Sequence, residues 1–284
     1  MSTSTSIGVR EITVAHSPDS DDAFMFYALA THKVRVSGLK FTHTLCDIET
    51  LNRKALEGFY DVTAISFHAY PYIQDKYALL ASGGSVGEGY GPMVVASRLY
   101  SLDDLAGLTI AVPGTLTTAY LALKLFSPNI QTEVVPFDKI IPEVIAGKYP
   151  AGLIIHEGQL TYDKSGLHRV IDLGKWWRDM TAMPLPLGGN AIRRDLGPEL
   201  MSCIATTLRD SILYGLDHRE EALAYAMQFA RDLDQTLADK FVGMYVNQRT
   251  VDYGEDGRDA IRRLLEVGHD AGIISVKPKV DFVD

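Results

Sequence analysis

The stretch EITVAHSPDSDDAFMFYALA, residues 11–30, decides the fold class. Residues 11–16 alternate in polarity as a strand does, and residues 23–30 form an apolar run of good helix formers. Between them, residues 17–22 are rich in the serine and aspartate side chains that begin helices. A strand, a polar turn and a helix are the opening unit of an α/β fold, which we therefore predict.

The same alternation continues along most of the chain, with short aliphatic runs separated by helical segments. We expect strands at 39–45, 61–66, 77–82, 92–97, 108–112, 132–136, 152–155 and 170–173, and helices at 47–57, 101–107, 119–126 and 140–147. The remaining third is mostly helical, at about 198–215, 218–231, 234–247 and 255–270.

Two stretches, 93–98 and 184–192, suit chain crossings between two α/β halves. The second is dense in proline and glycine, which restrict the backbone and permit unusual angles. We expect lobe 1 at residues 1–95 plus 190–284, and an inserted lobe 2 at residues 96–189. Two lobes joined twice enclose a cleft that can close like a hinge. The alternative is one continuous doubly wound sheet.

Composition limits the kinds of partner. The chain has 284 residues and a formal net charge of −9, which gives no electrostatic reason to expect nucleic acid or an anionic membrane as a partner. Its two cysteines, Cys46 and Cys203, form no metal-ligand spacing or disulfide framework. We find neither a secretory signal nor a run of about 18 apolar residues, so we expect a cytoplasmic location and no membrane insertion.

The run GLIIHE, residues 152–157, places His156 directly after a short buried strand. Ligands of open α/β sheets bind at the carboxyl ends of the strands. Imidazole is also the side chain that most readily changes protonation near neutral pH. We therefore predict that His156 is a catalytic residue at the mouth of the cleft. The alternative is a structural histidine bonded to a neighbouring carbonyl.

Three strand-to-helix turns are rich in small hydrogen-bond donors: residues 17–22, Ser66 with its neighbours, and residues 114–118. The free N–H groups at a helix N-terminus bind carboxylates and phosphates well. Thr117 and Thr118 add hydroxyl groups, so an anionic substrate group could dock there. The alternative is that these side chains only cap their helices.

Two other stretches resemble ligand sites but lack the defining motifs. Asp19, Asp21 and Asp22 do not have the spacing of a calcium loop, and we expect them to cap the helix that follows. Residues 83–91 contain five glycines but no phosphate-loop lysine, and we expect a mobile loop at the cleft edge.

Five stretches give the chain a likeness to a known family. They are SPDSDDAFMFYAL (17–29), DIETLNRKALEG (47–58), AVPG (111–114) with TTAY (117–120), GLIIHE (152–157) and PLPLG (184–188). In this order they resemble the 1,4-dihydroxy-6-naphthoate synthases, enzymes of the futalosine route to menaquinone. The likeness runs over nearly the whole chain, and the run ending in His-Glu is its most specific part.

The resemblance implies a two-lobed fold like that of type 2 periplasmic binding proteins, with a mixed sheet in each lobe. It implies a lyase that cleaves cyclic dehypoxanthine futalosine, a carboxylated small molecule, to 1,4-dihydroxy-6-naphthoate without a metal or organic cofactor. It leaves a homodimer open. The family's base falls on His156, and its substrate contacts fall on Ala64, Ile65, Ser66, Thr118 and Ala119; we add Ser17 and Thr117 from the turns.

The chain departs from the family at two points. The first turn usually reads SPCPND, whereas here it reads SPDSDD, with extra carboxylates. Position 64 is alanine where lysine is common, so the turn at Thr117 and Thr118 would have to hold more of the substrate's charge. Two other functions stay open: a chorismate dehydratase of the same fold, and a solute-binding protein that does not alter its ligand.

Overall fold

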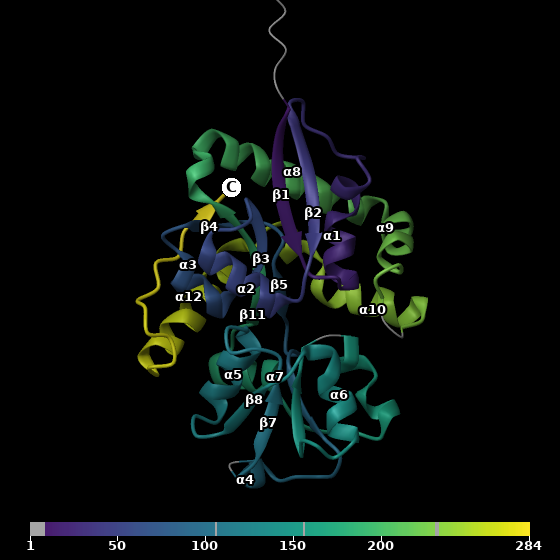
Figure 1. Ribbon diagram of the computed structural model, residues 1–284, viewed down its shortest axis with the longest axis vertical. Coiled ribbons are helices and arrows are strands. Elements are labelled where there is room, and N and C mark those ends of the chain that lie inside the picture. The colour runs from purple at the N-terminus through teal and green to yellow at the C-terminus, as the bar shows by residue number, and fades with distance from the viewer. Residues whose placement is uncertain (1–8, 106, 156, 231–232) are drawn as a thin grey trace, which may run out of the picture.

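The computed structural model describes residues 9–105, 107–155, 157–230 and 233–284. It contains two separate sheets, and each forms the centre of one lobe (Figure 1). We call the part built on the larger sheet lobe 1 and the part built on the smaller sheet lobe 2. The alternative of one continuous sheet is therefore wrong, and the two-lobed mixed α/β fold is confirmed.

The lobe 1 sheet has seven strands in the order β12-β4-β11-β3-β1-β2, with β5 paired to β11. Its strands are β1 (Arg10–His16), β2 (Leu39–Leu45), β3 (Val62–Ser66), β4 (Tyr77–Leu80), β5 (Ser85–Gly87), β11 (Leu185–Arg193) and β12 (Phe282–Val283). β1 runs parallel to β2 and β3, whereas β11 runs antiparallel to β3 and β4.

The lobe 2 sheet has five strands in the order β10-β6-β9-β7-β8. They are β6 (Met93–Ala96), β7 (Thr109–Val112), β8 (Gln131–Val134), β9 (Ala151–Ile154) and β10 (His168–Asp172). Four of them lie between the two stretches proposed as crossings, and β6 lies within the first of these stretches, 93–98. The sequence boundaries of the lobes themselves stay a prediction.

Helices cover both sheets and supply most of lobe 1 beyond its strands (Figure 1). They are α1 (Ser20–Ala30), α2 (Ile48–Glu57), α3 (Tyr70–Ile73), α4 (Leu102–Leu105), α5 (Thr118–Phe126), α6 (Phe137–Ile145), α7 (Leu173–Thr181), α8 (Pro198–Asp217), α9 (Arg219–Ala226), α10 (Gln235–Tyr245), α11 (Gln248–Val251) and α12 (Gly254–Asp270). Short 3₁₀ turns lie at Phe67–Ala69 (η1), Glu157–Leu160 (η2), Tyr162–Ser165 (η3) and Arg194–Leu196 (η4). No helix in the described ranges is long and apolar enough to cross a membrane.

Local sequence explains where several elements begin and end. α2 begins at Asp47, whose carboxylate accepts a hydrogen bond from the Thr50 N–H at 3.0 Å. It ends at Gly58, which has a left-handed φ of 75°. α1 is buried on almost every side because it packs between the lobe 1 sheet and the helices α8, α9 and α10. Residues 23–29 of the apolar run thus belong to the core cluster of lobe 1.

One core cluster continues from lobe 1 into lobe 2. It includes Ile65 and Leu264 from lobe 1 together with Leu121 of α5 and Trp177 of α7 from lobe 2. Trp177 is fully buried and its indole N–H donates to the Pro184 carbonyl at 3.1 Å, so it packs in the core with its polar atom satisfied. α5 therefore packs against apolar residues of both lobes.

Two segments differ from the sequence-based expectation. β11, which we took for a crossing, is a nine-residue strand between β3 and β4, because its proline and glycines fall where the pairing with β5 shifts register. The glycine-rich stretch 83–91 contains β5 and is not a plain loop. A Cβ atom on Gly84 would lie 1.9 Å from the Tyr253 ring, so this glycine permits close packing.

Candidate functional site

The cleft between the two lobes is the candidate site. Its walls include the carboxyl ends of β1 and β3 from lobe 1 and the turn between β7 and α5 from lobe 2. The cavity has about 760 Å³ of empty space, including the part open to solvent, which suits a small molecule. All the residues predicted to contact substrate line it: Ser17, Ala64, Ile65, Ser66, Thr117, Thr118 and Ala119.

Ser66 ends β3, and Asn52 of α2 orients its hydroxyl. The Asn52 side chain donates to Ser66 Oγ at 3.1 Å and accepts from the Ser66 N–H at 2.8 Å. Both residues are buried. Because the Ser66 oxygen already accepts a hydrogen bond from the scaffold, its own O–H can be directed at a ligand in the cleft.

Thr117 caps α5. Its Oγ1 accepts from the Tyr120 N–H at 3.1 Å and donates to the Gly114 carbonyl at 2.9 Å. The Thr117 hydroxyl is thus used within the turn, as the capping alternative requires. Its contribution to the cleft is to set the direction in which the first turn of the helix points.

Thr118 is the better hydroxyl donor of the two threonines. Its Oγ1 accepts from the His68 N–H at 3.2 Å, so its own O–H can point to a ligand. The first N–H groups of a helix have no carbonyl partner within that helix. At Thr118 and Ala119 these groups lie at the cleft wall, where the positive end of the helix dipole favours an anion.

His68 supports this turn but is not among the cleft-lining residues. Its Nδ1 lies 3.2 Å from the Thr117 carbonyl oxygen, and its ring stacks on Tyr120. Burial lowers the pKa of His68 to about 4, so the ring is neutral at physiological pH and donates from Nδ1. His68 therefore holds the α5 turn of lobe 2 against lobe 1.

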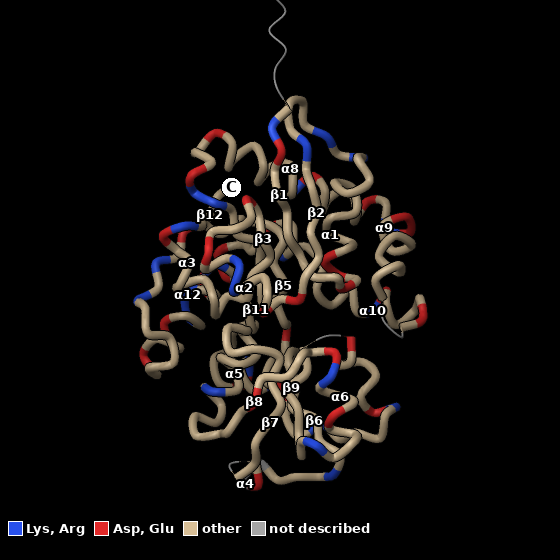
Figure 2. Tube along the Cα trace, viewed as in Figure 1, with Lys and Arg blue, Asp and Glu red and all other residues tan. Residues whose placement is uncertain are grey.

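The first turn presents carboxylates to the cleft, and the expectation that Asp19 caps α1 with its side chain is wrong. Ser17 donates its N–H to Asp22 at 2.7 Å and its hydroxyl to Asp19 at 3.0 Å, so both donors are used inside the turn. Asp19 is the N-cap of α1 but makes no side-chain capping bond. Asp19, Asp21 and Asp22 all line the cleft (Figure 2 shows this first turn of α1 in red, facing lobe 2).

The charged form of the Asp21 carboxyl is unfavourable in this arrangement. Desolvation raises the pKa of its carboxyl well above the ordinary value, and the neighbouring carboxylates of Asp22, Asp19 and Glu157 raise it further. A protonated Asp21 is neutral and can both donate and accept a hydrogen bond. It therefore adds less negative charge to the cleft than the sequence suggests.

The remaining predicted residues shape the wall. Ile65 is fully buried and its side chain belongs to the core, so it offers no polar group. Ala64 packs with Leu51 and Tyr60. No lysine, arginine or histidine of the described ranges lines the cleft, so an anionic ligand would be held there by hydroxyl and backbone N–H donors.

His156, the predicted catalytic residue, lies outside the described residues. Its neighbours on both sides are described. Ile155 lines the cleft, while Glu157 and Gln159 are buried in η2. Glu157 accepts a hydrogen bond from the Ser20 hydroxyl of lobe 1 at 2.6 Å.

The sequence analysis missed one wall of the cleft. It is formed by residues from the antiparallel strand β11 and from helix α10: Leu187, Gly188, Gly189, Phe241 and Tyr245. A Cβ on Gly189 would lie 2.3 Å from the Tyr253 hydroxyl oxygen, so only glycine fits between that ring and the cleft. The Gly188-Gly189 pair was the one indication of this wall in the sequence.

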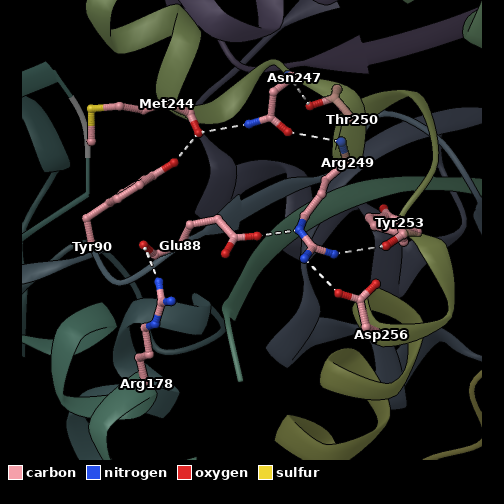
Figure 3. A network of polar contacts seen from close by, with 9 residues as sticks. All are labelled: Glu88, Tyr90, Arg178, Met244, Asn247, Arg249, Thr250, Tyr253 and Asp256. Carbon is pink, nitrogen blue, oxygen red and sulfur yellow. Dashed lines mark hydrogen bonds and ion pairs between the residues drawn. The ribbon is translucent and has the colours of Figure 1, made fainter. Parts of the chain in front are cut away.

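A polar network ties the segment between β5 and β6, where the chain crosses from the lobe 1 sheet to the lobe 2 sheet, to the C-terminal helices (Figure 3). Arg249 of α11 forms ion pairs with Glu88, which lies between β5 and β6, and with Asp256 of α12 at 2.7 Å. Arg178 of α7 donates to the Glu88 carbonyl at 3.0 Å. The other members of the network are Tyr90, Met244, Asn247, Thr250 and Tyr253. The crossing thus contacts both lobes.

The chain is similar over nearly its whole length to two enzymes of one name. It is 42% identical to 1,4-dihydroxy-6-naphthoate synthase of Thermus thermophilus, covering 97% of this chain and 100% of that protein. It is 38% identical to the Streptomyces coelicolor enzyme of the same name, covering 93% of this chain and 94% of the relative. A crystal structure of an Archaeoglobus fulgidus protein, 47% identical, superposes with a TM-score of 0.90 over 95% of this chain and all of the other.

More distant structures share the fold alone. An alkanesulfonate-binding protein from Xanthomonas axonopodis pv. citri, solved with bound MOPS, is 11% identical and has a TM-score of 0.70 over 95% of this chain and 94% of its own. The family model described as menaquinone biosynthesis matches residues 12–270. The protein is therefore an enzyme with a periplasmic-binding-protein-like fold that belongs to the menaquinone biosynthesis family.

Proposed function

We propose that this protein is a 1,4-dihydroxy-6-naphthoate synthase, which cleaves cyclic dehypoxanthine futalosine to 1,4-dihydroxy-6-naphthoate. The observation that carries the proposal is the full-length similarity to two enzymes of that name. The cleft supports it, because it is of small-molecule size and its hydroxyl and N–H donors suit a carboxylated ring.

In this proposal the substrate carboxylate is held by neutral donors at the lobe boundary. The Thr118 hydroxyl and the first N–H groups of α5 approach it from lobe 2, and the Ser66 hydroxyl approaches it from lobe 1. Binding would then draw the two lobes together around the ring. Closure removes water and fixes the ring's orientation toward the base.

Neutral His156 would act as the general base. It would remove a proton from the cyclic substrate, and the electron pair of that C–H bond would enter the ring. The ribose-derived fragment would leave with the electron pair of its bond to the ring and take up a proton. Aromatisation supplies the driving force, and a positioned base contributes about 10²–10⁴-fold in rate.

The test is product formation by the purified protein. Incubation with cyclic dehypoxanthine futalosine should yield 1,4-dihydroxy-6-naphthoate, identified by mass spectrometry. Chorismate in a separate reaction tests the dehydratase alternative. Calorimetry that shows tight binding of a ligand recovered unchanged, with no naphthoate formed, would instead identify a solute-binding protein.

A further inference from the structure

The segment that follows His156 in the sequence belongs to lobe 2 but is bound to lobe 1. In η2, Glu157 accepts a hydrogen bond from the Ser20 hydroxyl of α1 at 2.6 Å. Gln159 accepts one from the Tyr245 hydroxyl of α10 at 3.0 Å. α1 and α10 belong to lobe 1, whereas η2 follows β9 of the lobe 2 sheet, so both bonds cross the lobe boundary.

All four side chains of these two bonds are buried. Ser20 is fully buried, and Glu157, Tyr245 and Gln159 are each at most 5% exposed. Buried polar groups need hydrogen-bond partners, and losing a partner costs the desolvation of the group that remains. The adjoining residue Leu160 also packs against the lobe 1 core. η2 is therefore fixed to lobe 1 at three successive contacts.

A second set of contacts between the lobes lies elsewhere and does not adjoin the base. Glu49 of α2 accepts from the Leu116 N–H at 3.1 Å, and His68 contacts the α5 turn. These contacts can hold the lobes together without fixing the chain around residue 156. The contacts made by η2 are different, because Glu157 is covalently next to the proposed base.

We propose that Ser20 and Tyr245 are positioning residues: they bind η2, which directly follows the proposed base in the sequence, to lobe 1, and turnover depends on these two bonds. The inference rests on the proposed function. It assigns a catalytic consequence to two side chains of lobe 1 that lie outside the segment carrying the base. Displacing a catalytic group by about 1 Å can cost about 10²-fold in rate.

The experiment compares Ser20→Ala, Tyr245→Phe and the double variant with a matched control, Ser211→Ala. Ser211 is a fully buried serine that also bonds to α1, donating to the Met25 carbonyl at 3.0 Å, but its contact lies within lobe 1. We expect each single variant to lower kcat about tenfold and the double variant about 100-fold, with KM changed less than about threefold. Ser211→Ala should keep kcat.

A kcat in the double variant equal to that of Ser211→Ala would overturn the proposal while leaving the function intact. A second readout does not require turnover: the distance distribution between spin labels on exposed Lys40 of lobe 1 and Lys139 of lobe 2. It should broaden in the double variant and stay unchanged in Ser211→Ala. An unbroadened distribution also overturns the proposal. Absence of naphthoate from the wild-type protein would instead refute the proposed function.

Discussion

At the residue scale, the cleft uses hydroxyl groups whose oxygens are already engaged by the scaffold. Ser66 accepts from Asn52, and Thr118 accepts from the His68 N–H. Each hydroxyl hydrogen is thereby left to donate in one direction. Such donors have little freedom to lose when a ligand binds, which partly offsets the absence of a lysine at position 64.

Replacing His156 with asparagine removes the proposed base but keeps a side chain of similar polarity. We expect kcat for naphthoate formation to fall about 10²–10⁴-fold, because only proton removal is lost. Substrate affinity by calorimetry and the unfolding transition should stay close to the wild type. Near-normal turnover in this variant would exclude His156 from the mechanism.

Replacing Asp21 with asparagine tests the raised pKa of this carboxyl. In the folded state its pKa lies above the ordinary 3.8, so wild-type stability is lost as pH rises from about 4 through the folded-state pKa. Asparagine does not titrate. We expect Asp21→Asn to be more stable than the wild type by at least about 1 kcal/mol at pH 7 and equal to it below about pH 4.

Urea unfolding at several pH values measures this difference. Asp163→Asn is a suitable control, because Asp163 is exposed in η3 and is not among the cleft-lining residues. The difference in unfolding free energy between Asp163→Asn and the wild type should vary little with pH. A gap between Asp21→Asn and the wild type that is constant from pH 4 to pH 8 would show that Asp21 is ionised in the folded protein.

At the element scale, the neighbouring threonines of α5 should have separable roles. Thr117→Val removes the cap on the Tyr120 N–H, and we expect unfolding free energy to fall by about 1 kcal/mol. Thr118→Val removes the hydroxyl aimed at the cleft and the acceptor of the His68 N–H, and we expect KM to rise about tenfold. Steady-state kinetics and urea unfolding of both variants distinguish the roles. Equal effects of the two variants on KM would contradict the assignment.

The elements also show what sequence alone can predict. β1, its turn and α1 were predicted because polar and apolar residues alternate in residues 11–16, whereas residues 23–30 are a continuous apolar run of helix formers. Ser66 and Thr118 were found because strand and helix ends carry chemistry in α/β folds. β11 was missed because proline and glycine are typical of turns, although register shifts in a sheet also accommodate them. Tyr245 could not be found, because only tertiary packing brings α10 to the cleft.

At the scale of the whole molecule, the two lobes meet through a shared apolar cluster and through polar contacts at two places. α5 of lobe 2 packs in the same cluster as α12 of lobe 1, and the turn before it accepts a hydrogen bond from lobe 1 and donates one to it. Separately, η2 reaches lobe 1 through the Ser20 and Tyr245 bonds.

Arg249 joins the segment between β5 and β6 to lobe 1, together with the hydrogen bond from the Tyr90 hydroxyl to the Met244 carbonyl. Arg249→Met keeps the aliphatic stem but leaves Glu88 and Asp256 without their shared cation. The Arg249 side chain is only 26% exposed, so we expect unfolding free energy to fall by about 1–3 kcal/mol. Arg262→Met is the control. Arg262 pairs with Asp259 on the exposed surface of α12, so its replacement should lower the unfolding free energy by less than about 1 kcal/mol.

Since Glu88 also bonds to lobe 2 through Arg178, the spin-label distribution between the lobes should broaden in Arg249→Met but not in the control. Equal unfolding free energies in the two variants would show that the crossing does not depend on this network.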